Sequence, residues 1–134
     1  MGILDQRNLG YKELDYTVFP SEEKTIEVQN DETYGGAHLY RIKLSEGFND
    51  GKTIYTDDFN YIQFVQKDDD GSVTPGLQSE QLAYVLLDRA KKLNARFPSP
   101  QNEKQIAGLQ MFLDACKERV EERINRGVMG ELKK

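Results

Sequence analysis

Three arginines near the C-terminal end of the sequence have the residue type and spacing that best fit a chemical task. Arg119, Arg123 and Arg126 follow one another at spacings of four and three residues, which places them on one face of an α-helix. Arginines one turn apart repel each other by about 0.2–0.5 kcal/mol unless an anion lies between them. Because a guanidinium binds phosphate oxygens in pairs, this spacing favours a site for a phosphate-bearing ligand.

An aromatic ring and an amide stand at the other end of the same segment. Asn102 falls near the third position of a helix that begins after Ser99, where free backbone N–H groups favour an anion or a polar base edge. Phe97 comes just before this helix and can provide a stacking surface for a nucleobase. The candidate ligand-binding residues are therefore Phe97, Asn102, Arg119, Arg123 and Arg126.

The same residues also fit a purely structural interpretation. Glu118, Glu121 and Glu122 interleave with the arginines, and Glu122 is placed to pair with both Arg119 and Arg126. A solvated helix covered with ion pairs explains this pattern as well as a phosphate site does. Phe97 can likewise be a core residue that closes a helical hairpin, and the pattern alone leaves both interpretations open.

The sequence contains no constellation typical of an enzyme or a metal site. One His and one Cys leave no catalytic triad, and His38 has no second His or Cys pair beside it with which to hold a metal. The run Asp68–Asp70 lacks the alternating ligands of a calcium loop and is expected to be a solvated turn. We therefore expect a binding protein that has no catalytic residues, metal or cofactor.

Composition narrows the class of protein further. The chain has 134 residues and 37% hydrophobic residues, below the usual 45–50% or so, and such a thin core favours completion by other copies of the chain. A net charge of −5 argues against nucleic acid as a partner. No stretch approaches the ~20 apolar residues of a membrane span. The lone Cys116 is expected to be a packed side chain and favours a reducing cytosol.

The charge is unevenly distributed along the chain. Residues 1–88 contain seven Lys and Arg against seventeen Asp and Glu, a balance of −10, whereas residues 89–134 contain eleven against six, a balance of +5. An acidic front half joined to a basic tail fits a local anion pocket better than a surface that covers DNA. It also suits head-to-tail contact between subunits.

The front half predicts one small antiparallel sheet. Period-two alternation and strand-forming residues mark the expected strands, and Asn49-Asp50-Gly51 predicts a tight hairpin turn between two of them. The acidic stretch 68–76, which contains Gly and Pro, is expected to be a connector without regular structure. The expected strands cover residues 25–29, 38–44, 52–55 and 61–65, with a further candidate at 15–19.

The back half predicts two antiparallel helices. Ser79 is the expected N-cap of the first helix, which Pro98 ends, and Ser99 with Pro100 begins the second helix, which Gly127 ends. The expected apolar stripes are Leu82, Val85, Leu86, Ala90 and Leu93 on the first helix, and Ile106, Leu109, Leu113, Cys116, Val120 and Ile124 on the second. The predicted fold class is α+β, with a small β-rich domain and connector over residues 1–76 and a C-terminal helical hairpin over 77–134, in an oligomer.

Several motifs in both halves of the sequence occur together in one known group of proteins. They are Tyr34-Gly35-Gly36-Ala37-His38-Leu39-Tyr40 and Tyr61-Ile62-Gln63-Phe64 in the front half, and Ser79-Glu80-Gln81-Leu82, Phe97-Pro98, Asn102, Glu118-Arg119-Val120, Arg123 and Arg126-Gly127-Val128-Met129-Gly130 in the back half. In these motifs the chain resembles the phage Thoeris anti-defence protein one family. A related hairpin occurs in phage anti-CBASS sponge proteins.

The resemblance implies a sponge for a nucleotide signal. Members of that family bind cyclic ADP-ribose isomers (gcADPR-type signals) made by bacterial TIR-domain immune enzymes and release them intact, and some also hold cyclic trinucleotides at a separate subunit junction. Carried over to this sequence, Asn102, Arg119 and Arg123 grip the ligand, Phe97 contacts the base, and Arg126 belongs to the glycine-containing end motif. The resemblance also implies a homo-oligomer, dimer or hexamer, that shares the site between subunits in the host bacterial cytoplasm.

Two other functions remain compatible with the sequence. A phage structural or assembly protein would use the charge asymmetry for contacts between subunits, with its arginines neutralised by glutamates. An enzyme that degrades the signal would bind the same ligand and cleave it.

Overall fold

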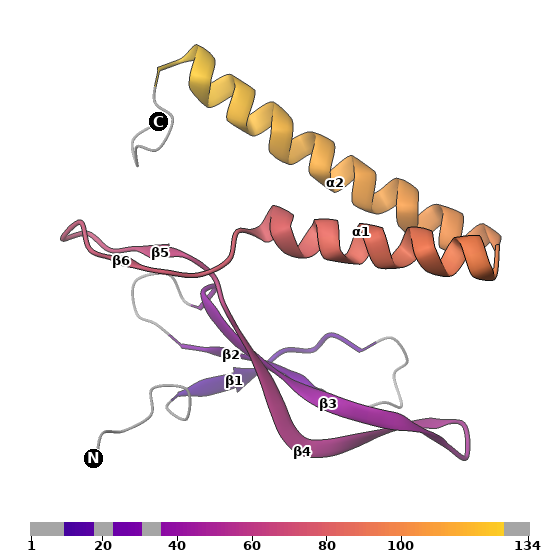
Figure 1. Ribbon diagram of the computed structural model, residues 1–134. Helices are drawn as coiled ribbons and strands as arrows, with labels where there is room; N and C mark the ends of the chain where they lie inside the picture. Colours follow the sequence, from indigo (N-terminus) through magenta and orange to yellow (C-terminus); the bar gives the residue numbers. More distant parts are fainter. Residues whose placement is uncertain (1–9, 18–22, 31–35, 128–134) are drawn as a thin grey trace. The chain divides into compact units, whose positions relative to one another are not determined.

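The computed structural model describes residues 10–17, 23–30 and 36–127. The chain divides into two compact units, Met1–Leu77 and Gln78–Lys134. The first unit contains an antiparallel four-stranded sheet and the second a pair of helices (Figure 1). The predicted α+β class, with the sheet first and the helix pair second, is therefore confirmed. The unit boundary lies one residue after the predicted one.

The sheet has the strand order β1-β2-β3-β4, and every neighbouring pair is antiparallel. The strands predicted at 52–55 and 61–65 belong to one continuous strand that ends at Gln63, so the prediction of two short strands was wrong here, and residues 64 and 65 lie beyond the strand. Between the pairs Lys43↔Phe59 and Ser45↔Tyr55, three residues of β4 lie opposite one residue of β3. Strand β4 therefore contains a bulge rather than a break. The bounds are β1 Tyr11–Glu13, β2 Ile26–Gln29, β3 Leu39–Asn49 and β4 Lys52–Gln63.

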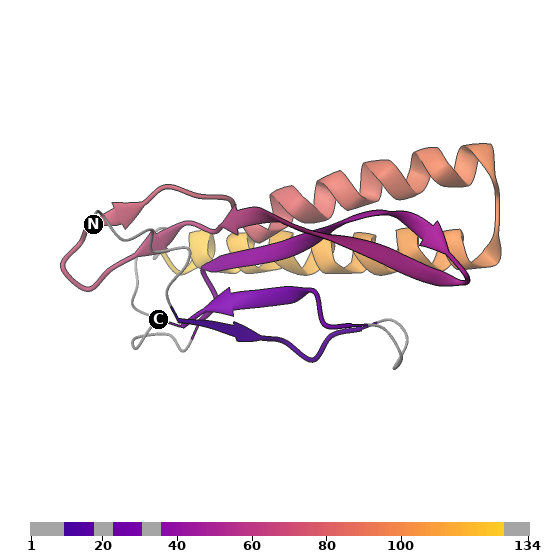
Figure 2. The same ribbon diagram turned by 90° about the horizontal axis from the view of Figure 1, so that it is seen from below.

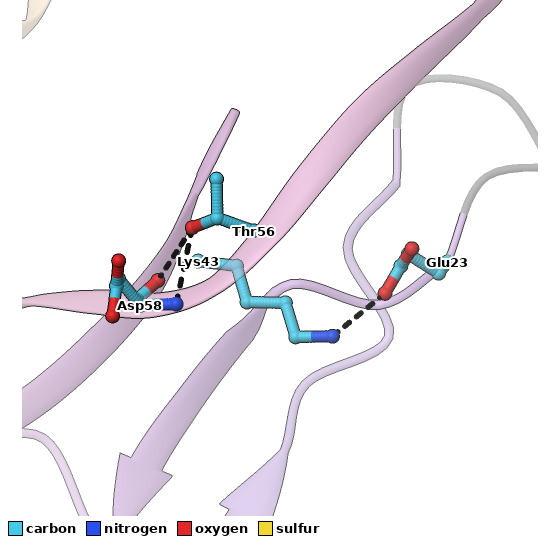
Figure 3. A network of polar contacts seen from close by, with 4 residues as sticks. All are labelled: Glu23, Lys43, Thr56 and Asp58. Carbon is cyan, nitrogen blue, oxygen red and sulfur yellow. Dashed lines mark hydrogen bonds and ion pairs between the residues drawn. The ribbon is translucent and has the colours of Figure 1, made fainter. Parts of the chain in front are cut away.

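Side-chain contacts hold this irregular part of the sheet. The Thr56 hydroxyl oxygen accepts a hydrogen bond from the backbone N–H of Asp58 at 3.0 Å within the bulge (Figure 3). On β3, the Lys43 ammonium reaches the Glu23 carboxylate at 2.8 Å (Figure 3). A poor strand former such as Asp58 is thus accommodated because a neighbouring hydroxyl satisfies its N–H.

The predicted hairpin turn is present between β3 and β4. Asp50 has φ 54° and Gly51 has φ 74°, the two positive values that a two-residue hairpin turn needs. The strand candidate at 15–19 was wrong for residues 15–17, which have no regular structure, and residues 18 and 19 lie outside the described residues. The strand at this end of the sheet is β1, which comes earlier in the chain.

Arg41 joins all four strands of the sheet. Its Nη2 and Nε atoms lie 2.7 and 2.8 Å from the Glu27 Oε1 atom, and its guanidinium carbon lies 4.1 and 4.4 Å from the ring centroids of Tyr11 and Phe59. Burial lowers the pKa of Arg41, but the hydrogen bonds to Glu27 and Tyr61 more than offset this and raise it above its ordinary value. The cation is fully satisfied by contacts within the sheet.

The segment predicted as an irregular connector contains a small hairpin. Strands β5 (Gln66–Lys67) and β6 (Val73–Thr74) pair with each other. In the turn between them Asp70 Oδ1 accepts hydrogen bonds from the Ser72 hydroxyl at 2.6 Å and the Ser72 N–H at 2.8 Å. These two bonds hold the pKa of Asp70 below its ordinary value. The three aspartates therefore form a turn stabilised by its own hydrogen bonds.

The two helices are α1 (Ser79–Arg96) and α2 (Pro100–Asn125). The predicted start of α2 is confirmed, because the Ser99 hydroxyl oxygen accepts the N–H of Asn102 at 3.0 Å and Pro100 is the first helical residue. The predicted cap of α1 was wrong by one residue. Gln78 is the cap, and its N–H donates to the Gln81 Oε1 atom at 2.7 Å. Within the described residues, no helix is both long and apolar enough to cross a membrane.

The helices meet through a small core. Ala83, Leu87 and Leu113 are buried together, and Ile106 and Leu109 pack against them. The predicted stripe of α1 was partly wrong, because Val85, Leu86 and Leu93 are 62%, 52% and 42% exposed. Apolar residues surround α1 on most sides, so periodicity alone did not identify the buried face. Small alanines occupy that face and let the helices approach closely.

We expect Arg41→Ala to lower the free energy of unfolding of the sheet by about 2–4 kcal/mol. The substitution removes two cation–π contacts and leaves the half-buried Glu27 without its cation. Six of the seven tyrosines precede residue 78, so near-ultraviolet circular dichroism during urea unfolding reports on the sheet. The control Lys43→Ala breaks an ion pair whose acidic side chain is 53% exposed and should cost less than about 1 kcal/mol. Equal losses in the two variants would contradict the role given to Arg41.

Candidate anion-binding cavity

Arg119 and Arg123 line a cavity of about 400 Å³. Its walls come from the beginning of α1 and from the C-terminal half of α2. A volume of this size is typical of small-molecule sites, which measure roughly 300–1,000 Å³. The lining residues are Gln78, Ser79 and Glu80 from α1 and its cap, and Phe112, Ala115, Cys116, Arg119, Val120 and Arg123 from α2.

The geometry of the helix pair places these residues together. The helices lie close at their connection and diverge toward the start of α1 and the end of α2 (Figure 1). Phe112, Cys116, Arg119 and Arg123 are spaced by four, three and four residues, so they share one face of α2. That face is directed to the start of α1, since residues 78–80 line the same cavity.

The three candidate arginines of α2 differ in their partners. The Arg126 Nη2 atom lies 2.8 Å from the Glu122 Oε1 atom, and Arg126 is the C-cap of α2. Among the described residues of the helical unit, no carboxylate forms an ion pair with Arg119 or Arg123. Glu122 therefore pairs with one of its two expected partners only. The ion-pair interpretation holds for Arg126 and fails for the two arginines of the cavity.

Electrostatics in the cavity favour an anion. Arg119 and Arg123 bring two positive charges, and the start of α1 carries the partial positive charge of a helix N-terminus, although its cap Gln78 already accepts the N–H of Gln81. Glu80 is the single carboxylate among the lining residues that the structure describes. A ligand with two negative charges would find two guanidiniums and a helix start, with one carboxylate left to accept hydrogen bonds.

Asn102 and Phe97 lie away from this cavity in the same chain. Arg119 comes seventeen positions after Asn102 on α2, a distance along the axis of about 25 Å. The Asn102 Nδ2 atom donates to the Phe97 backbone oxygen at 2.9 Å, so it helps to close the connection between the helices. The Phe97 ring is 67% exposed and lies 5.5 Å from the Arg96 guanidinium. One hairpin thus brings together two of the five predicted site residues, Arg119 and Arg123.

The lining residues at the start of α1 were not among the sequence-based candidates. Gln78, Ser79 and Glu80 reach the cavity through the pairing of the two helices, and no local pattern signals that. Phe112 and Cys116 could have been found, because they continue the spacing of the arginines toward the N-terminus of α2.

The lining residues are suited to binding. They include no His, and Cys116 is the one thiol. Within the residues that the structure describes, no three His, Cys, Asp or Glu side chains are grouped so that they could hold a metal ion. The arrangement can neutralise a dianion, stack an aromatic group on Phe112 and accept hydrogen bonds at Glu80.

Searches with the sequence against protein-family models and against curated proteins find no match. The resemblance to the anti-defence family therefore stays a prediction. The geometry of the cavity supports binding of an anion independently of it.

Cys116 gives a test of the positive potential in the cavity. We expect the double substitution Arg119→Gln/Arg123→Gln to slow the reaction of Cys116 with the anionic reagent DTNB by roughly tenfold relative to its reaction with neutral iodoacetamide. The ratio of the two rates removes differences in the reactivity of the thiol itself. Lys117→Gln, an exposed cation on the same helix that does not line the cavity, is the matched control and should leave the ratio unchanged. An unchanged ratio in the double variant would mean that the two arginines do not act on the cavity.

Proposed function

We propose that this protein is a phage anti-defence sponge that binds a cyclic ADP-ribose isomer made by Thoeris TIR enzymes and sequesters it without cleavage. Its place of action would be the host bacterial cytoplasm. The observation that supports the proposal most is the pair Arg119 and Arg123, which line a cavity without an acidic partner among the described residues. The family resemblance supplies the identity of the ligand.

The chemistry of the ligand matches the groups in the cavity. A cyclic ADP-ribose carries two phosphate charges, a purine face and ribose hydroxyls. Arg119 and Arg123 are one turn apart, so two neighbouring phosphates can take one guanidinium each. The Phe112 side chain, 45% exposed, offers a face for the purine, and the Glu80 carboxylate can accept hydrogen bonds from ribose hydroxyls.

We further propose that two copies of the chain share the site. Asn102 lies about 25 Å along α2 from Arg119 and Phe97 precedes α2 at the same end, so they can contact the same ligand only from another subunit. A second copy packed antiparallel along α2 would bring its Phe97 and Asn102 to the cavity. The exposed apolar residues Phe112 and Ile124, at 45% and 60%, would then be covered. A dimer, or a hexamer built from such dimers, satisfies this arrangement.

Sequestration sets the required affinity. A sponge must hold a signal that is present at nanomolar to micromolar concentration, so the binding free energy should be near −12 kcal/mol, which is about nanomolar. Charge-assisted contacts to both phosphates and one stacking contact can reach this value if the site is rigid and closed to water. Closure by a second subunit provides that condition.

We expect Arg119→Ala and Arg123→Ala each to weaken the binding of cyclic ADP-ribose isomers by about 2–5 kcal/mol, because each leaves one phosphate without its cation in a desolvated site. Isothermal titration calorimetry gives the affinities. Circular dichroism should show an unchanged fold, since neither side chain has an ion-pair partner among the described residues.

Lys117→Ala is the matched control for these two variants. It removes a cation from the same helix outside the cavity and should bind like the parent protein. If both arginine variants also bind like the parent, the site lies elsewhere.

A second prediction separates a sponge from an enzyme that degrades the signal. After incubation with cyclic ADP-ribose and heat denaturation of the protein, we expect the supernatant to contain the ligand intact and in stoichiometric amount, since the cavity has a thiol without a His to activate it. Chromatography with mass detection measures the recovery. Substoichiometric recovery of the ligand, with a cleavage product, would establish an enzyme and contradict the proposal.

A further inference from the structure

The end of the β3–β4 hairpin forms a ribbon with an exposed aromatic residue near its tip. Strand β2 pairs with β3 only up to Ile42, so from Ser45 to Tyr55 the two strands pair with each other alone. This part of the hairpin extends beyond β1 and β2 (Figure 2). Phe48, one residue before the turn segment, is 76% exposed. Its ring is therefore accessible to another molecule at the end of the ribbon.

The same ribbon is acidic. Residues 44–58 contain four Asp and Glu and one Lys, a balance of −3. Glu46 and Asp50 flank Phe48 in the sequence. Within the described part of the chain, neither of them forms an ion pair. The tip therefore combines one apolar side chain with two unneutralised carboxylates.

The helix pair contains a groove of about 450 Å³ that is complementary to this tip. It is separate from the cavity of Arg119 and Arg123. Its apolar lining includes Leu86, Leu93 and Leu109. At Gly108 nothing lies within 4 Å of the position that a Cβ atom would take. The missing side chain thus leaves this part of the groove open.

Two cations border the groove, one on each helix. They are Arg89 of α1 and Lys104 of α2. Neighbouring acids are engaged elsewhere: Asp88 pairs with Lys92 at 2.9 Å, and Glu103 accepts a hydrogen bond from Asn94 at 2.9 Å. No ion pair to Arg89 or Lys104 occurs among the residues that the structure describes.

We propose that the ribbon tip of one copy of this chain docks into this groove of a second copy. Phe48 lies on the apolar floor, and Glu46 and Asp50 face Arg89 and Lys104. The contact joins two different surfaces of the chain, so successive copies are added head to tail.

Two substitutions block the two sides of this contact. Phe48→Ser removes the docked ring, and Gly108→Leu fills the groove at a position that has room for a side chain and favours helix. We expect sedimentation without added ligand to show that each variant self-associates at least about tenfold more weakly than the parent protein. Met111→Ser, which removes a 73% exposed apolar side chain of α2 outside the groove, is the control and should associate like the parent.

Mixing the two blocked variants gives the decisive result. The Phe48→Ser variant retains an intact groove and the Gly108→Leu variant an intact tip, so the mixture should form a one-to-one complex that neither forms alone. A mixture that stays monomeric, or a parent protein that is monomeric at all accessible concentrations, would overturn the proposal. The proposal would also be overturned if either variant self-associated as strongly as the parent protein.

Charge reversal tests the polar part of the contact. Glu46→Lys/Asp50→Lys and Arg89→Glu/Lys104→Glu should each remove the self-association that the tip-to-groove contact provides, and an equal mixture of the two should recover it. Lack of recovery would overturn the assigned pairing. The Arg119→Ala/Arg123→Ala variant should lose the nucleotide ligand and still keep the tip-to-groove contact, so this inference and the proposed function fail under different measurements.

Discussion

The helical unit depends on one small contact between its two helices. Ala83 and Leu87 of α1 are buried against Leu113 of α2, and the alanine allows the backbones to approach closely at this point. Because α2 has 26 residues and α1 has 18, the last turns of α2 extend without a partner helix. Both hollows of the unit follow from this geometry: the cavity of Arg119 and Arg123 near the start of α1, and the apolar groove nearer the connection.

The arginines of this chain differ in whether the fold itself neutralises their charge. Arg41 lies between the Tyr11 and Phe59 rings and contacts the Glu27 carboxylate, so its charge stabilises the sheet and is not available to a ligand. Arg119 and Arg123 repel each other across one helical turn and have no acidic partner among the described residues. Glu122 lies one turn from Arg119 as well as from Arg126, and it pairs with Arg126. In the proposed function these two charges, on Arg119 and Arg123, are the ones available to an external anion.

The sequence alone was sufficient to predict the structure where neighbouring residues determine it. The Asp50-Gly51 turn and the Ser99-Pro100 helix start depend on neighbouring residues only, and both were predicted correctly. Prediction was weakest where the fold combines distant segments. Apolar residues at many positions of α1 hid the face that contains Ala83 and Leu87, and the part of the cavity contributed by Gln78, Ser79 and Glu80 depends on how the helices pair. The two cavity arginines were identified because their spacing on one helix is itself local.

A single copy of the chain buries few of the apolar side chains of its helix pair. The buried cluster of the helix pair is small, while Val85, Met111 and Ile124 are each at least 60% exposed. In the proposed shared site, Phe97 and Asn102 meet Arg119 across a subunit boundary, and in the proposed tip-to-groove contact Phe48 lies in the groove of another copy. Ligand binding and assembly would then depend on different surfaces of the same helix pair, so that the protein could assemble before the ligand arrives and close around it without reorganising its subunit contacts.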